Sequence, residues 1–159
     1  MKILVPVDYS EHSRAVLNYA LRFAQKFDGE VTAAHVWETK PNVPPHLKVK
    51  TPDGRTTTAG ELIREEALGA MEQFLRSMNL PAGSRVSSCI LSGAAAEAIV
   101  KKAEQGGYEL VVMGTQSRKG FGRLVLGSVA ERVIKSATMP VLAVPLARVS
   151  APPGAGELV

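Results

Sequence analysis

The chain opens with MKILVPVDYS (residues 1–10), the stretch that decides the fold. At its centre, Ile3-Leu4-Val5-Pro6-Val7 is a short apolar run with no polar alternation. Such a run is typical of a strand buried on both faces, as the strands of parallel sheets are. Ser10 follows almost at once and is a residue type that caps helices. The opening therefore predicts a buried strand that leads directly into a helix.

Apolar runs and helical stripes alternate along the rest of the chain. Further strands are expected at residues 31–36, 86–91, 109–113 and 141–144, and helical stripes at residues 15–27, 63–78, 94–105 and 129–137. This alternation predicts an α/β domain with a parallel sheet and helices on both faces. Right-handed crossovers make the sheet doubly wound, while the order of its strands stays open at this stage.

Composition narrows the class of protein. The 159 residues are 45% hydrophobic and 21% charged, which suits one globular domain, expected over residues 1–146, with a disordered tail at 147–159. A net charge of +4 is mild for a nucleic-acid binder, so no nucleic acid is expected as a partner. The sequence has no apolar run long enough to span a bilayer and a single cysteine. We therefore expect no membrane association and a cytoplasmic location.

Residues 38–60 interrupt the regular alternation. Prolines and an Asp-Gly pair are scattered through this segment, and we expect it to form no regular element. A loop of this length is unusual in a compact domain. Two interpretations remain open: a mobile excursion or a lid over a ligand.

The crossover that begins at Gly114 carries the residues best suited to an anion. Gly114 follows the fourth expected strand, and ligands of doubly wound sheets bind beyond the carboxyl ends of strands. Gly127-Ser128 opens the next helix, whose free amides and dipole favour phosphate. Arg118 could neutralise phosphate charge. The alternative is a flexible surface loop with solvated cations.

The same residues resemble the universal stress protein family. The resemblance rests on Gly114-x-x-Ser117, nine further residues and Gly127-Ser128-Val129, together with the stretches at residues 3–10, 93–99 and 139–144. It covers residues 2–145. It implies a five-stranded parallel sheet, often of order 3-2-1-4-5, homodimers and, in one branch of the family, bound ATP.

The resemblance also assigns roles within a nucleotide site. It implies that Pro6, Val7 and Asp8 line the adenine and ribose side, with Val36 and Met113 as an apolar wall. The ATP-binding branch has glycine where this chain has Ser117, whose side chain could crowd the phosphates or donate its hydroxyl. Because the other loop anchors are intact, we expect ATP, or else AMP or ADP, with Mg²⁺ as a further candidate.

Alternatives remain for individual residues. Asp8 could cap the following helix rather than contact a ligand. His12 is expected on the surface, and His35 is expected to be a structural histidine within its strand. The histidines and the cysteine lack metal-ligand spacing, so no metal site of protein ligands is expected.

Three functions follow from these residues. The leading one is an ATP-binding regulatory protein of the stress response, and the second is a dimeric interaction protein without nucleotide. The third, a slow ATPase, is weakest because no side chain other than Asp8 could act as a base, so we expect no enzyme. The short apolar strand from Val141 to Val144, last in the sheet, is expected to join two copies into a homodimer.

Overall fold

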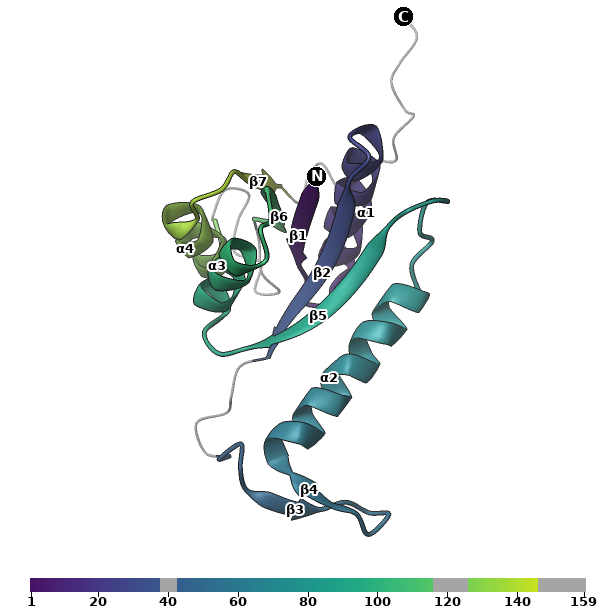
Figure 1. Ribbon diagram of the computed structural model, residues 1–159, viewed down its shortest axis with the longest axis vertical. Helices are drawn as coiled ribbons and strands as arrows, with labels where there is room; N and C mark the ends of the chain where they lie inside the picture. The colour runs from purple at the N-terminus through teal and green to yellow at the C-terminus, as the bar shows by residue number, and fades with distance from the viewer. Residues whose placement is uncertain (38–42, 116–125, 146–159) are drawn as a thin grey trace, which may run out of the picture.

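The computed structural model describes residues 1–37, 43–115 and 126–145 (Figure 1). Its elements, in chain order, are β1 (Lys2–Pro6), α1 (Glu11–Lys26), β2 (Glu30–Trp37), β3 (Lys48–Lys50), β4 (Thr56–Thr58), α2 (Ala59–Arg76), β5 (Val86–Ser92), α3 (Ala95–Gln105), β6 (Leu110–Gly114), α4 (Ser128–Ser136) and β7 (Val141–Val144). The expected tail at 147–159 and most of the crossover after β6 lie outside the described residues.

Five of these strands form a parallel sheet in the order β5-β2-β1-β6-β7. Both the parallel sheet and the strand order 3-2-1-4-5 are thereby confirmed. β1 lies at the centre and pairs with β2 on one side and with β6 on the other. Its residues Ile3, Leu4 and Val5 are 0% exposed, as the unbroken apolar run predicted.

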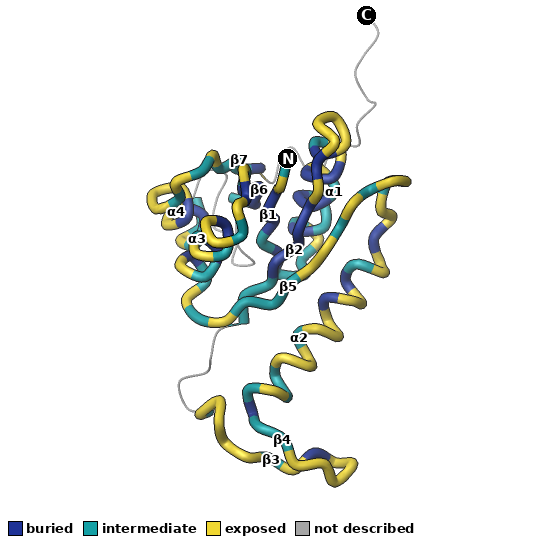
Figure 2. The backbone as a smooth tube through the Cα atoms, viewed as in Figure 1, coloured by how far each residue is buried: buried dark blue, intermediate teal, exposed yellow. Residues whose placement is uncertain are grey.

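Helices cover both faces of this sheet (Figure 1). Val16 and Leu17 of α1 and Phe74 of α2 belong to the core on one face. Ile99 of α3 and Val133 of α4 belong to the core on the other face. Figure 2 shows the buried residues concentrated in β1, β2 and β6 and on the inner sides of α1, α3 and α4.

The expectation that residues 38–60 form no regular element is wrong for their second half. β3 and β4 pair as an antiparallel hairpin, and α2 begins at Ala59. Three consecutive β-branched threonines favour a strand, and Gly54 at φ +85° supplies the left-handed residue that the connecting turn needs. Thr58 and Glu61 then form a capping box that starts α2. Residues 38–42 lie outside the described part.

The hairpin lies at the end of α2 that is farther from the sheet (Figure 1). It is held to the helix by a bidentate ion pair in which Arg55 donates to Glu65, with N···O distances of 3.0 and 2.6 Å. Of the helices in the described ranges, none is both long and apolar enough to cross a membrane.

Candidate functional site

A cavity of about 180 Å³, open to solvent, lies at the carboxyl ends of β1, β2 and β6. Its lining combines the strand ends with residues of α1, α3 and α4: Pro6, Val7, Asp8, His12, Ser13, Val16, Ala34, His35, Val36, Ala95, Ile99, Met113, Gly114 and Val129. The structure thus brings together seven of the predicted site residues: Pro6, Val7, Asp8, Val36, Met113, Gly114 and Val129. Ser117 and Arg118 lie outside the described residues.

Gly127 and Ser128 form the start of α4 beside this cavity. The Gly127 N–H donates to the Thr115 carbonyl at 2.7 Å, and the Thr115 N–H donates to the Val144 carbonyl at 3.2 Å. These two bonds fix both ends of the crossover. Gly127 is the N-cap and has no side chain with which to bond the first amides of the helix. An uncapped helix start of this kind is suited to an anion.

The backbone of Gly127 does not require glycine. Its φ of −62° and ψ of 146° are extended values that any residue adopts. Any need for glycine at this position must therefore come from the space around it rather than from conformation.

The start of α1, in contrast, is occupied by the chain's own side chains. Ser10 Oγ accepts from the Ser13 N–H at 3.1 Å. Asp8 Oδ1 accepts from the Ser10 N–H at 3.1 Å, from Ser10 Oγ at 2.5 Å and from Ser13 Oγ at 2.6 Å. The alternative role for Asp8, in which it stabilises the following helix, is therefore present in the structure. The first amides of α4 are therefore without a side-chain cap, whereas those of α1 are already bonded by side chains of the chain itself.

An aromatic stack fixes the turn between β1 and α1. Tyr9 has a positive φ of 63° and stacks on His35 with ring centroids 4.2 Å apart. The Nδ1 atom of His35 lies 2.8 Å from the Val7 carbonyl oxygen, so the expectation of a structural histidine is confirmed. The Tyr9 hydroxyl donates to the Ala67 carbonyl at 3.2 Å, and burial raises the pKa of Tyr9 to about 12. These contacts hold the Asp8 end of β1 in place.

His12 was expected on the surface, and this expectation is wrong. The residue is partly buried, its ring lies against Gly114, and both ring nitrogens are enclosed. A methyl group on Gly114 would collide with His12 Nε2. Burial lowers the pKa of the His12 imidazole, an effect that the nearby charge of Asp8 opposes. A signal was available in the sequence: the first turn of a helix that follows a strand directly faces the carboxyl edge of the sheet.

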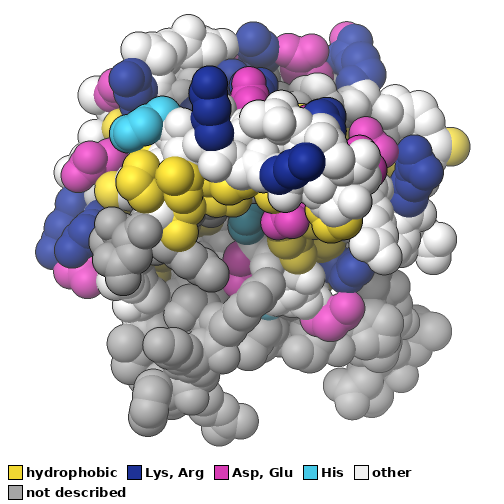
Figure 3. Space-filling model, turned by 90° about the horizontal axis from the view of Figure 1, so that it is seen from below, with side chains coloured by type: hydrophobic (Ala, Val, Ile, Leu, Met, Phe, Trp, Pro, Cys, Tyr) yellow, Lys and Arg dark blue, Asp and Glu magenta, His cyan; other side chains and the backbone are white. Residues whose placement is uncertain are grey.

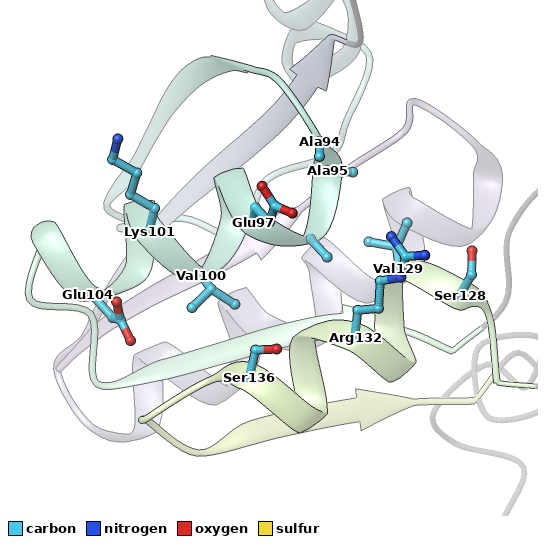
Figure 4. A pocket seen from close by; sticks show the side chains of 11 residues that line it. Ala94, Ala95, Glu97, Val100, Lys101, Glu104, Ser128, Val129, Arg132 and Ser136 are labelled. Atoms are coloured by element: carbon cyan, nitrogen blue, oxygen red, sulfur yellow. The ribbon is translucent and has the colours of Figure 1, made fainter.

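A second and larger cavity, of about 640 Å³, adjoins the first and was not expected from the sequence. It lies between α3 and α4, whose side chains form its opposite walls (Figure 4), and it shares Ala95 and Val129 with the smaller cavity. Ser128 and Arg132 line one wall, and Glu97 lines the other. The smaller cavity alone is below the roughly 300–1,000 Å³ typical of ligand pockets. A nucleotide-sized ligand would therefore extend from it towards Ser128.

The surface seen from below combines apolar area with charges of both signs. Figure 3 shows hydrophobic side chains gathered in a band across this face, with acidic and basic side chains interspersed around it. Within residues 1–37, 43–115 and 126–145, no group of three or more His, Cys, Asp or Glu side chains is placed to hold a metal ion.

Comparison with known protein families finds one match over most of the chain. The model of the universal stress protein family matches residues 1–145. Universal stress protein MJ0531 of Methanocaldococcus jannaschii is 37% identical over 143 residues, covering 90% of this chain and 81% of the relative. Universal stress protein MJ0577 of the same organism is 30% identical and covers 90% of this chain and 93% of the relative.

Solved structures of similar fold carry the same family name. The structure of MJ0577 superimposes with a TM-score of 0.66 at 28% identity, covering 91% of this chain and 94% of that one. A universal stress protein solved in complex with cAMP has a TM-score of 0.66 at 18% identity and covers 91% and 96% of the two chains. One from Archaeoglobus fulgidus, solved with dAMP, has a TM-score of 0.57 at 21% identity and covers 90% and 96%.

The contact between His12 and Gly114 leads to a prediction for stability. Gly114→Ala should lower the free energy of unfolding in the unmodified protein, because the new methyl group meets the imidazole. In a His12→Ala background the same change should cost less, with a coupling of about 1 kcal/mol, within the range of residues in contact. Urea denaturation of the four proteins in this double-mutant cycle measures the coupling. Additive costs would show that the two residues do not touch.

Proposed function

The chain belongs to the universal stress protein family, and from this premise we propose that it is a stress-response protein that binds an adenine nucleotide. The site is the cavity at the carboxyl ends of β1 and β6. The observation that carries the proposal is the start of α4, which has no side-chain cap and lies beside a largely apolar cavity. At this point the crossovers that follow β1 and β6 leave on opposite faces of the sheet.

The lining residues match the parts of a nucleotide. Val36 and Met113 supply apolar surface for a base, beside Pro6 and Val7 at the end of β1. Asp8, which lines the cavity and bonds the start of α1 through Oδ1, is proposed to accept from ribose hydroxyls. Two relatives of the same fold have been solved in complex with cAMP and with dAMP, which supports an adenine nucleotide as the ligand here.

The phosphates would lie at the start of α4. The Ser128 and Val129 amides are free of a side-chain cap from Gly127, and a phosphate there would also meet the helix dipole. Ser117 and Arg118 are proposed as further phosphate contacts from the crossover. ATP is the preferred ligand, with AMP and ADP as shorter alternatives, and Mg²⁺ would be held mainly by the phosphates themselves.

A second candidate function is a dimeric interaction protein without nucleotide. Ser117 in place of the usual glycine favours this alternative, as does β7 at one edge of the sheet. Val141–Val144 is short and apolar, it pairs only with β6 within the described sheet, and Pro140 and Pro145 flank it. Two such strands can pair antiparallel across a twofold axis, so we propose a homodimer through β7 whether or not nucleotide binds.

Nucleotide binding is tested by calorimetry on the nucleotide-free protein. ATP should bind with micromolar-range affinity, and AMP should bind more weakly because it offers the start of α4 fewer charges. Gly127→Val should abolish binding, since the isopropyl group would fill the space of a phosphate. Gly69→Val is the matched control: Gly69 lies on α2 with open space around it, so ATP affinity should not change. Absence of binding heat with the unmodified protein at high concentration would refute the proposal.

Turnover should be negligible. The residue best placed to act as a base, Asp8, is already engaged by Ser10 and Ser13, so we propose a binding protein rather than an ATPase. Phosphate release from ATP should fall far below the rate of about 1 to 10³ per second of ordinary enzymes. A rate within that range that Asp8→Ala removes would instead support the third function, a catalytic site.

The dimer is tested by placing one lysine on either edge of the sheet. Ala143→Lys on β7 should yield monomers, because the charge would lie against the partner strand. Ser88→Lys on β5, the opposite edge strand, should leave the dimer intact. Light scattering at micromolar concentration distinguishes the two states. A dimer that survives Ala143→Lys and dissociates with Ser88→Lys would show that the interface is formed by β5 and would contradict the proposed dimer.

A further inference from the structure

Among the side chains that line the cavity, His12 is the one whose buried polar atoms make no hydrogen bond within the described part of the chain. Nδ1 and Nε2 are both enclosed, and neither has a hydrogen-bond partner among the described residues. Enclosed polar atoms are almost always paired in native proteins, because an unpaired one loses its bonds to water and gains none in return. Such an atom at a ligand cavity indicates a partner that arrives with the ligand.

The position of the ring indicates which part of the ligand that partner is. Nε2 is the atom nearest to the missing side chain of Gly114, the last residue of β6. Gly114 leads into the crossover whose other end is fixed at Gly127, where the proposed phosphates lie. The ring therefore lies against the residue from which the crossover towards the proposed phosphate position begins.

We propose that His12 contacts the phosphates of the bound nucleotide and takes up a proton when it does so, which makes nucleotide affinity rise as the pH falls. This inference rests on the proposed function and adds to it a proton-linked contact. The step is a proton transfer from solvent to the imidazole, and no covalent bond of the nucleotide changes.

The charged groups around the ring determine whether its protonation strengthens or weakens nucleotide binding. Asp8 at the end of β1 and His35 on β2 are the other titratable groups that line the cavity in the described chain. Residues contributed by α3, β6 and α4 are Ala95, Ile99, Met113, Gly114 and Val129, which carry no charge. On α1 itself, Glu11 and Arg14 pair with each other at 3.0 Å.

In the free protein, burial lowers the pKa of His12 more than Asp8 raises it, so the ring is neutral near pH 7. A phosphate dianion beside the ring favours the imidazolium and raises the pKa in the complex. Between the two pKa values binding takes up a proton, and each linked proton changes affinity by up to about tenfold per pH unit. Affinity should therefore increase from about pH 8 to about pH 6, the range in which histidine titrates.

The experiment compares ATP binding by three proteins across this pH range. Calorimetry in two buffers of different ionisation enthalpy gives both the affinity and the number of protons taken up. His12→Gln keeps a polar side chain that cannot become charged, and the exposed His46→Gln is the matched control. Titration of ATP itself is common to all three, so only the difference between proteins reports on His12.

The expected result is proton uptake at pH 7 by the unmodified protein and by His46→Gln that is smaller in His12→Gln. The affinity ratio of unmodified protein to His12→Gln should grow at least about threefold between pH 8 and pH 6. As a second measurement, the NMR titration of the His12 ring should show a higher pKa with AMP bound. Equal pH profiles in all three proteins would overturn this inference and leave nucleotide binding standing, whereas no binding at any pH would overturn both.

Discussion

The site depends on the position of β1 at the centre of the sheet, hydrogen-bonded to β2 on one side and to β6 on the other. The crossover after β1 places α1 on one face, and the crossover after β6 places α4 on the other. Because the two connections leave in opposite directions, the described part of the chain does not close the edge between them. The cavity lies at this edge, and the buried residues of the strands that border it, β1, β2 and β6, are 0–8% exposed.

The helix starts around this edge differ in what satisfies them. At α1 the polar side chains of Asp8, Ser10 and Ser13 bond one another and the first amides. At α4 the N-cap is Gly127, which has no side chain that could accept a hydrogen bond from the first amides of the helix. An incoming anion therefore meets amides without a side-chain cap at α4, whereas at α1 it would compete with the chain's own side chains. His12 lies in the first turn of α1, against Gly114.

The strands and helices with a clear pattern of apolar residues could be predicted from the sequence. The carboxyl edge of the sheet, where the site residues meet, could be predicted as well. The buried strand at residues 3–5 and the placement of Asp8, Met113 and Gly114 around one cavity follow from apolar runs and from the topology that the resemblance implied. The β3–β4 hairpin was not predicted, because Pro52 in its turn and the prolines before β3 outweighed the strand preference of its threonines. The contact of His12 with Gly114, about a hundred residues away in the sequence, could not be predicted, and only the place of His12 in the first turn after a strand indicated that it faces the carboxyl edge of the sheet.

The central claim is that an adenine nucleotide binds with its phosphates at the start of α4. Its most direct test is a two-dimensional ¹H–¹⁵N NMR titration of the labelled protein with ATP. The account predicts that the largest amide shifts occur at Gly114, Ser128 and Val129, with smaller shifts at Val7 and Asp8. Shifts confined to the hairpin or to α2, or a spectrum that ATP does not change, would contradict it.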